Sequence, residues 1–214
     1  MGAKDWMLFY ANGEIRPILQ SAPAIDRTAT GALVRRLYPA HRVAEIADGT
    51  LLERATPQPV RSTPDASPGL PFACTSDAAL DRPSQLNRRF LDAAAGRTVC
   101  LHAMHSVVDW FAYAVWPGGP TLRRALSLAP GYGIIEDIAT SLAFEEPYWA
   151  GKRPVVTGED SDPGYPFPFH PLELAEAALR ALFGFNYEGI ALDDDPDLVR
   201  IVLAGFAIQP AAGT

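Results

Sequence analysis

Histidines and an acid interrupt an otherwise apolar stretch, residues 99–116, and these side chains have the clearest chemical potential in the chain. His102 and His105 lie three residues apart and are followed by Asp109 and four aromatic rings. Apolar runs that build a core normally contain no imidazole or carboxylate, so a hydrogen-bond network, a metal or a ligand must satisfy these groups. The stretch therefore predicts a site but does not specify a reaction.

The spacing of the two histidines argues against a metal centre. Side chains alternate between the two faces of a strand, so His102 and His105 would point to opposite sides of a sheet. An HxxH pair outside a helix is a much weaker metal signal than HExxH, and Cys74 and Cys100 form no CxxC motif. We therefore expect a hydrogen-bonded structural histidine pair, and we predict neither a bound metal nor a cofactor.

Aromatic side chains alternate along the strand expected after Asp109. Asp109, Phe111 and Tyr113 would share one face, and Trp110 would lie on the other. An exposed row of this kind can bind sugars, nucleobases or cationic groups through its ring faces. Helices that cover both faces would instead make both rows part of the core, and this is the arrangement that we favour.

Two later segments add candidate binding residues. The adjacent acids Glu145 and Glu146 would diverge on any regular element, so a solvated acidic surface is their simpler interpretation. His170 ends the segment YPFPFH, whose alternating prolines and rings favour an extended strap. The full set of candidate binding residues is His102, His105, Asp109, Trp110, Tyr113, Glu145, Glu146, Tyr148, Trp149 and His170.

The composition indicates a globular chain with long proline-rich connections. Of its 214 residues, 48% are apolar, 20% are charged and 20 are proline, against a usual proline share of about 5%. The net charge of −7 disfavours a nucleic-acid partner, which would require a basic surface. Because neither a signal peptide nor an apolar run of membrane-spanning length is visible, we expect a cytoplasmic protein with reduced cysteines and no membrane partner.

The pattern of apolar residues predicts an α+β fold, with a mixed or antiparallel sheet, several helices and long proline-rich loops in one domain over residues 1–214. Strands are expected at 4–11, 70–76 and 97–104, hairpins at 42–55 and 107–128, and helices at 26–38, 84–95, 133–142, 171–183 and from Asp195 onward. The five prolines within 56–71 predict a surface loop or linker, and a possible internal boundary.

Four segments of the chain resemble an actinobacterial family known only as a domain of unknown function. These are GAKDWMLFYANG, LHAMHSVVDWFAYAVW, GIIEDI with FEEPYWAG, and PFPFHPLELAEAALRALFGF. The resemblance extends from Met1 to about Gly189 and implies a small soluble bacterial protein. It implies no activity, cofactor or catalytic residue.

Two functions from different classes fit these observations. Aromatic rows, proline-rich loops and an acidic surface without a recognised catalytic spacing favour a non-catalytic domain that binds a small molecule or a protein partner. The chain contains no GxGxxG, GxxxxGK[ST] or GxSxG motif. The alternative is a hydrolase or lyase in which five ionisable residues converge on one pocket. Those residues are His102, His105, Asp109, Glu145 and His170.

Overall fold

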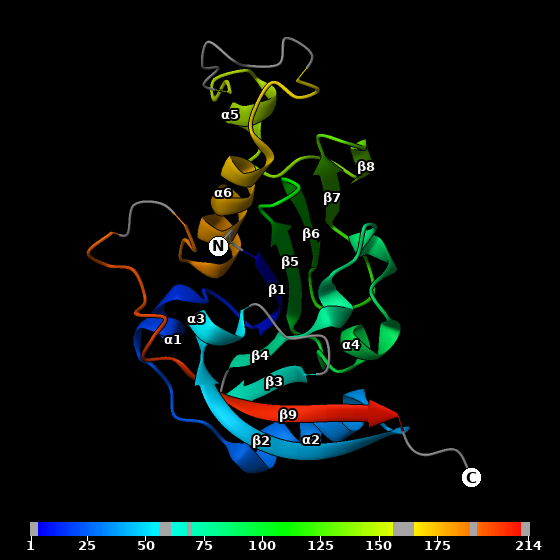
Figure 1. The fold of residues 1–214 in the computed structure, drawn as a ribbon, viewed down its shortest axis with the longest axis vertical. Helices are drawn as coiled ribbons and strands as arrows, with labels where there is room; N and C mark the ends of the chain where they lie inside the picture. The colour runs from blue at the N-terminus through cyan, green and yellow to red at the C-terminus, as the bar shows by residue number, and fades with distance from the viewer. Residues whose placement is uncertain (1–3, 56–60, 68–69, 156–164, 189–191, 211–214) are drawn as a thin grey trace.

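One antiparallel β-sheet organises the chain (Figure 1). The computed structural model describes residues 4–55, 61–67, 70–155, 165–188 and 192–210. Within them, nine strands follow the order β2-β9-β3-β4-β1-β5-β6-β7-β8, and each pair of neighbours is antiparallel. Helices pack on both faces of this sheet, so the predicted α+β class is confirmed.

The elements have the following bounds. The strands are β1 Lys4–Ala11, β2 His41–Thr50, β3 Arg61–Ser67, β4 Leu70–Cys74, β5 Thr98–His105, β6 Trp110–Trp116, β7 Arg124–Ala129, β8 Gly133–Ile138 and β9 Val202–Pro210. The α-helices are α1 Arg16–Gln20, α2 Arg27–Leu37, α3 Leu51–Arg54, α4 Arg88–Asp92, α5 Glu146–Trp149 and α6 Pro171–Phe183, and two 3₁₀ turns are η1 Ser76–Ala78 and η2 Pro83–Gln85. In the part of the chain described, no helix is long and apolar enough to cross a membrane.

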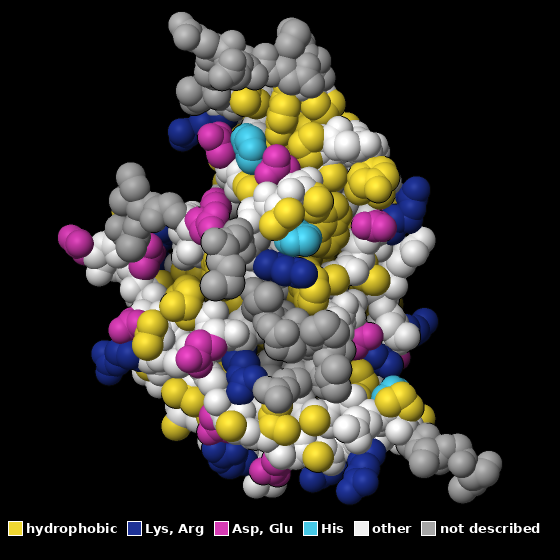
Figure 2. All heavy atoms as spheres, in the orientation of Figure 1, with side chains coloured by type: hydrophobic (Ala, Val, Ile, Leu, Met, Phe, Trp, Pro, Cys, Tyr) yellow, Lys and Arg dark blue, Asp and Glu magenta, His cyan; other side chains and the backbone are white. Residues whose placement is uncertain are grey.

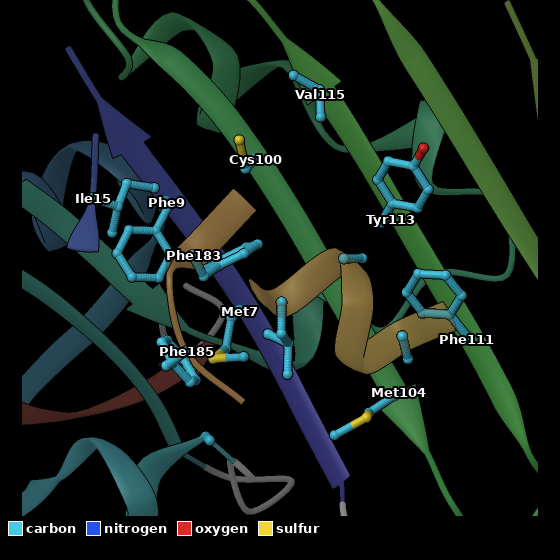
Figure 3. Packing of buried hydrophobic residues seen from close by; sticks show 14 of the residues in the cluster. Met7, Phe9, Ile15, Cys100, Met104, Phe111, Tyr113, Val115, Phe183 and Phe185 are labelled. Carbon is cyan, nitrogen blue, oxygen red and sulfur yellow. The ribbon is translucent and has the colours of Figure 1, made fainter. Parts of the chain in front are cut away.

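The sheet twists strongly and is buried on both sides. In Figure 1, β2, β9, β3 and β4 cross the lower part of the molecule, whereas β5, β6 and β7 stand upright beside β1. On one face α6 packs over β1, β5 and β6, where Phe183 contacts Phe9 edge to face (Figure 3). On the other face Leu33 of α2 and Phe90 of α4 belong to a second core together with Trp116. Central strands that are covered on both faces have nearly continuous apolar sequences, and β1 and β6 show this pattern.

Local signals at its two ends position helix α6. Pro171 occupies the first turn, where its missing N–H is not needed. Gly184 ends the helix in the left-handed region with φ 80°, and a Cβ there would lie 2.5 Å from the Cβ of Arg16. Glycine is therefore required at this position by backbone conformation and by space. The helix predicted over 171–183 is confirmed.

The hairpin predicted over 42–55 is wrong. Residues 41–50 form the single strand β2, whose antiparallel partner is β9 from the other end of the chain. Asp48 and Gly49 fall at an irregularity in that pairing rather than at a turn. Thr50 and Glu53 then form a capping box: the Thr50 hydroxyl accepts from the Glu53 N–H at 3.2 Å, and the Glu53 carboxylate accepts from the Thr50 N–H at 2.9 Å. This start signal begins α3 and ends the strand.

Three predicted helices also differ from the structure. Residues 133–138 form the strand β8, because pairing with β7 outweighs the helical spacing of its isoleucines. The chain after Asp195 enters β9 rather than a helix. The helix predicted over 84–95 is divided into η2 and α4, because the Ser84 hydroxyl and N–H both donate to Glu136, and Asn87 caps α4 instead.

The proline-rich segment is only partly a loop. Residues 61–67 form β3, which pairs with β4 and β9 inside the sheet, so the surface loop predicted for 56–71 is wrong there. Residues 56–60 and 68–69 lie outside the described residues. The strands predicted at 4–11, 70–76 and 97–104, and the antiparallel pairing within 107–128, are confirmed.

Candidate functional site

A cavity of about 690 Å³ opens on the sheet face that α2 and α4 also cover. Trp6, His105 and Trp110 line it from β1, β5 and β6. Asp81, between η1 and η2, and Tyr132, in the turn between β7 and β8, line it from the loops. Small-molecule sites are commonly apolar hollows of about 300–1,000 Å³ with a few polar groups. We call this hollow the Trp6–Trp110 cavity.

The register of three strands explains why these side chains meet. Lys4 pairs with His105, and His105 pairs with Trp110, so the three residues form one row across the sheet. Trp6 lies two residues further along β1, on the same face, opposite Ala103. The short side chain of Ala103 leaves the space above the sheet to its larger neighbours. The cavity is thus a consequence of mixing large and small side chains on one face.

Two tryptophans line the cavity with their rings rather than with their N–H groups. The indole Nε1 atoms of Trp6 and Trp110 are buried and have no hydrogen-bond partner in the described part of the chain. An indole N–H is a donor only. Because these atoms have almost no accessible surface, a ligand in the cavity would contact the rings of the two residues.

Positive charge lies beside these donors. The Nζ of Lys4 is 4.4 Å from the centroid of the Trp6 ring, which is cation–π geometry. Burial, together with the charge of Lys4, lowers the pKa of His105, so its imidazole is neutral at pH 7. A neutral imidazole offers one donor and one acceptor. Among the described residues that line the cavity, Asp81 is the one acid, and its side chain is exposed.

His102 lies on the opposite face from His105, as strand alternation predicts, and is fully buried. Its Nε2 donates to the backbone oxygen of Ala175 at 3.0 Å, because a carbonyl can only accept. Its Nδ1 is 2.7 Å from the Oδ1 of Asp5, so the two side chains share a second proton. Both ring nitrogens of His102 are therefore engaged in hydrogen bonds. The Cys100 thiol lies on the same face, and burial raises its pKa to about 12. The pair of Asp5 and His102 fastens α6 to the sheet and faces no described cavity.

Glu145 forms a closed buried network on the α6 face. Its carboxylate accepts from the Arg124 Nε at 2.9 Å and Nη2 at 2.7 Å, and from the Tyr113 hydroxyl at 2.6 Å. The Leu142 N–H at 2.7 Å and the Trp149 Nε1 at 3.3 Å complete the set. Although burial opposes ionisation, these donors lower the pKa of Glu145 below its ordinary value. The network leaves no lone pair free for chemistry and is structural.

Asp109 and His170 approach each other at the end of the molecule that holds the start of α6. The His170 Nε2 is 3.7 Å from the Asp109 Oδ2, and both side chains are about one third exposed. The His170 Nδ1 accepts from the Leu172 N–H, so this ring caps α6. Asp109 adopts φ 49° in the turn between β5 and β6. Their contact joins that turn to the helix.

The remaining candidates lie around α5. Tyr148 is buried, and its hydroxyl donates to the Glu173 backbone oxygen at 3.0 Å. Trp149 packs edge to face on Phe169, at 4.8 Å between ring centroids. Glu146 is exposed. The aromatic corner thus anchors the strap that leads into α6.

A broader groove of about 810 Å³ runs along α6 past Tyr148, His170 and Glu176. Some of its polar groups are already paired: the Glu176 carboxylate accepts from the N–H groups of Tyr187 and Glu188 and from Asn186. The Trp6–Trp110 cavity, lined mostly by apolar and aromatic residues, is the better candidate site for a small molecule.

The molecular surface carries both signs of charge. On the face shown in Figure 2, acidic and basic side chains are interspersed among hydrophobic ones rather than gathered in a stripe of one sign.

The structure brings together only part of the set expected from sequence. His105 and Trp110 share the cavity, whereas His102, Tyr113, Glu145 and Tyr148 are buried on the other side of the sheet. The pocket in which five ionisable residues converge is not formed, because alternation separates His105 from His102 and a closed network holds Glu145. In the described residues, no group of three or more His, Cys, Asp or Glu is arranged to hold a metal.

Sequence reasoning missed Trp6, Lys4, Asp81 and Tyr132. Trp6 lines the cavity, and Lys4 lies over the Trp6 ring, because β1 pairs with β5, a contact between residues about a hundred positions apart. The available signal was the alternation of Lys4 and Trp6 with the apolar core positions of β1. That signal places them on one face but does not identify the neighbouring strand.

A family of unknown function (DUF6928) matches residues 5–206, so the chain belongs to this family. The match begins at the second residue of β1, includes β2 to β8 and ends within β9. No curated protein and no solved structure matches the chain.

Proposed function

We propose that this member of a family of unknown function is a non-catalytic binding domain that takes a small molecule into the Trp6–Trp110 cavity. The observation that carries the proposal is a hollow of about 690 Å³ whose lining combines the rings of Trp6, Trp110 and Tyr132 with the imidazole of His105. Small-molecule sites are commonly apolar hollows of this size with a few polar groups. A bound small molecule would fill this volume.

The ionisable groups of the chain support binding rather than turnover. General acid–base catalysis needs side chains held within hydrogen-bond reach of a reacting group and of each other. In the described residues, His105 makes no hydrogen bond or ion pair with a carboxylate. Two fully buried ion pairs, Asp5 with His102 and Glu145 with Arg124, are closed inside the core.

The test uses the four tryptophans as reporters. Each indole N–H gives one ¹H–¹⁵N resonance, and Trp6→Phe and Trp110→Phe variants assign the two cavity signals. A panel of small aromatic and aliphatic compounds, with acidic, neutral and basic members, is then titrated. We expect some members to shift the Trp6 and Trp110 signals and to leave that of Trp149, which donates to Glu145, unchanged.

Two glycines provide a matched pair of variants. A Cβ built at Gly131 or at Gly119 meets nothing within 4 Å, and neither backbone is in the left-handed region. Gly131 lines the cavity, whereas Gly119 lies in the turn between β6 and β7. Gly131→Leu should weaken panel binding, and Gly119→Leu should leave it unchanged. If no compound shifts either cavity indole, the proposed function is refuted.

A further inference from the structure

We infer that a second site, between the last turn of α2 and the chain that follows α4, binds a phosphate group through the guanidinium groups of Arg36 and Arg97. Neither arginine lines the Trp6–Trp110 cavity, so the inference does not rest on the proposed function. It follows from two positive charges that lie side by side without a carboxylate partner in the described part of the chain.

One backbone oxygen brings the two arginines together. The Arg36 Nη2 donates to the Ala93 oxygen at 3.1 Å, and the Arg97 Nη2 donates to the same oxygen at 3.3 Å. Arg36 belongs to the last turn of α2, whereas Arg97 follows α4 and precedes β5. The Arg97 Nε also donates to the Ala94 oxygen at 2.7 Å, which fixes the plane of this guanidinium. The fold therefore holds two like charges next to each other.

No acid balances this pair among the described residues. The acceptors that Arg36 and Arg97 have there are backbone oxygens, which carry only partial charge. Burial raises the pKa of the Tyr10 hydroxyl, and the charges of three arginines, Arg36 and Arg97 among them, oppose that rise. The third, Arg89, pairs with Asp77 at 3.1 Å. The cluster around Tyr10 thus has more positive than negative charge.

The free N–H groups of the pair can reach a ligand. Arg36 is exposed and Arg97 is half-buried. The Arg97 Nη1 is open to solvent and makes no hydrogen bond with the described residues, and the same residues leave the Arg36 Nε and Nη1 without a partner. Burial, and the nearby charge of Arg36, lower the pKa of Arg97, which shows that the charged form lacks a counter-ion here.

A phosphate group matches the charge and the donors. The planar guanidinium fork fits two oxygens of a phosphate or a carboxylate. A phosphate monoester carries a charge of about −1.5 to −2 at pH 7 and has three acceptor oxygens. Two guanidinium groups are therefore balanced by one phosphate group, whereas a carboxylate carries a single charge on two oxygens. The same chemistry serves free phosphate and a phosphate group carried by a small molecule.

Inorganic phosphate tests the site in the full chain. The ¹H–¹⁵N signals of the arginine Nε groups are followed as sodium phosphate replaces sodium chloride at constant ionic strength, and Arg36→Gln and Arg97→Gln assign the two signals. We expect both signals to shift and to saturate with phosphate. If neither signal shifts, or if both drift without saturation, the inference is overturned.

A matched pair of variants separates the site from general attraction between charges. Arg36→Gln removes one exposed charge of the pair, and it should weaken phosphate binding, measured at the Arg97 signal, by about fivefold or more. Arg200→Gln removes an exposed charge close before β9 and should leave the affinity unchanged. Equal weakening in both variants would show that phosphate only follows the overall charge, and would overturn the inference.

Two further probes define the ligand. Acetate should bind at least about fivefold more weakly than phosphate, and equal affinities would overturn the assignment to phosphate. Methyl phosphate distinguishes the sources: tighter binding than inorganic phosphate supports a phosphorylated small molecule, and weaker binding supports free phosphate. The indole signals of Trp6 and Trp110 should not respond to any of these anions, so the phosphate site and the binding function of the cavity can fail independently.

Discussion

Replacing Glu145 with Gln removes one of the two negative charges that pair with the buried Arg124, the other being Asp137. The Arg124 and Glu145 side chains are 1% and 0% exposed, and two bonds of 2.7 and 2.9 Å join them. A Gln side chain has one acceptor oxygen, so the donors grouped on the other carboxylate oxygen lose their partner. The NH₂ group of Gln would then face one of the two groups of donors. One group is Arg124 Nη2 and Trp149, and the other is Arg124 Nε, Tyr113 and Leu142.

The expected cost is large. Removing one partner of a buried ion pair costs about 3–5 kcal/mol when the other charge is left without compensation. Arg124 keeps Asp137 and two backbone oxygens as partners of its Nη1, so the low end of this range, about 3 kcal/mol, is expected. For a chain of this size each kcal/mol lowers Tm by about 2–4 °C, so the midpoint should fall by about 6–12 °C. Thermal unfolding followed by circular dichroism, with urea unfolding to obtain the free energy, measures the change.

An exposed ion pair provides the control. Arg88 and Asp92 are 3.3 Å apart on α4, with side chains 77% and 62% exposed. Asp92→Asn should cost no more than about 0.5 kcal/mol, because water screens this pair. A loss below about 1 kcal/mol in Glu145→Gln would refute the reasoning that this carboxylate compensates a buried guanidinium.

Two further predictions concern acid stability and backbone strain. Hydrogen-bond donors lower the pKa of Glu145 in the folded protein. Its contribution to stability is therefore present above the ordinary glutamate pKa and is lost as the pH falls through the lowered value. Tm measured from pH 7 to 3 should fall less steeply in Glu145→Gln than in the wild type, and equal slopes would contradict this. Ala139 is exposed and adopts φ 66°, so Ala139→Gly should raise the free energy of unfolding by about 0.5–1 kcal/mol. Ala150→Gly, at φ −78°, should lower it, and both are measured by urea unfolding.

Local signals predicted some elements well. α6 follows from Pro171 and Gly184, which fix its ends, and from an apolar stripe between them. β1, β5 and β6 follow from continuous apolar runs that are buried on both faces. These signals are strong because they depend on the residues of the element itself.

Elements decided by distant pairing were not predictable in the same way. Ile134 and Ile138 fit one face of a helix, yet β8 forms because β7 offers its edge. Asp195 precedes a proline, a pattern that predicts a helix cap, but its carboxylate forms ion pairs with Arg180 and Arg16 instead. Long-range partners thus override local propensity where the local sequence permits both structures.

The candidate site was predictable only in part, because strand pairing between distant residues also decides which side chains meet. Alternation separated His102 from His105 and put Trp110 and Tyr113 on opposite faces, as the structure shows. The closing of Glu145 into a network depends on Arg124, which belongs to another strand. Sequence identified residues with chemical potential, and the pairing of strands decided which of them face a cavity.

A crystal structure of the chain with the tightest-binding panel compound tests the central claim most directly. We expect density for the compound inside the Trp6–Trp110 cavity, in contact with the rings of Trp6 and Trp110. Density for the compound in the groove along α6, with the cavity empty, would contradict the claim that this cavity is the binding site.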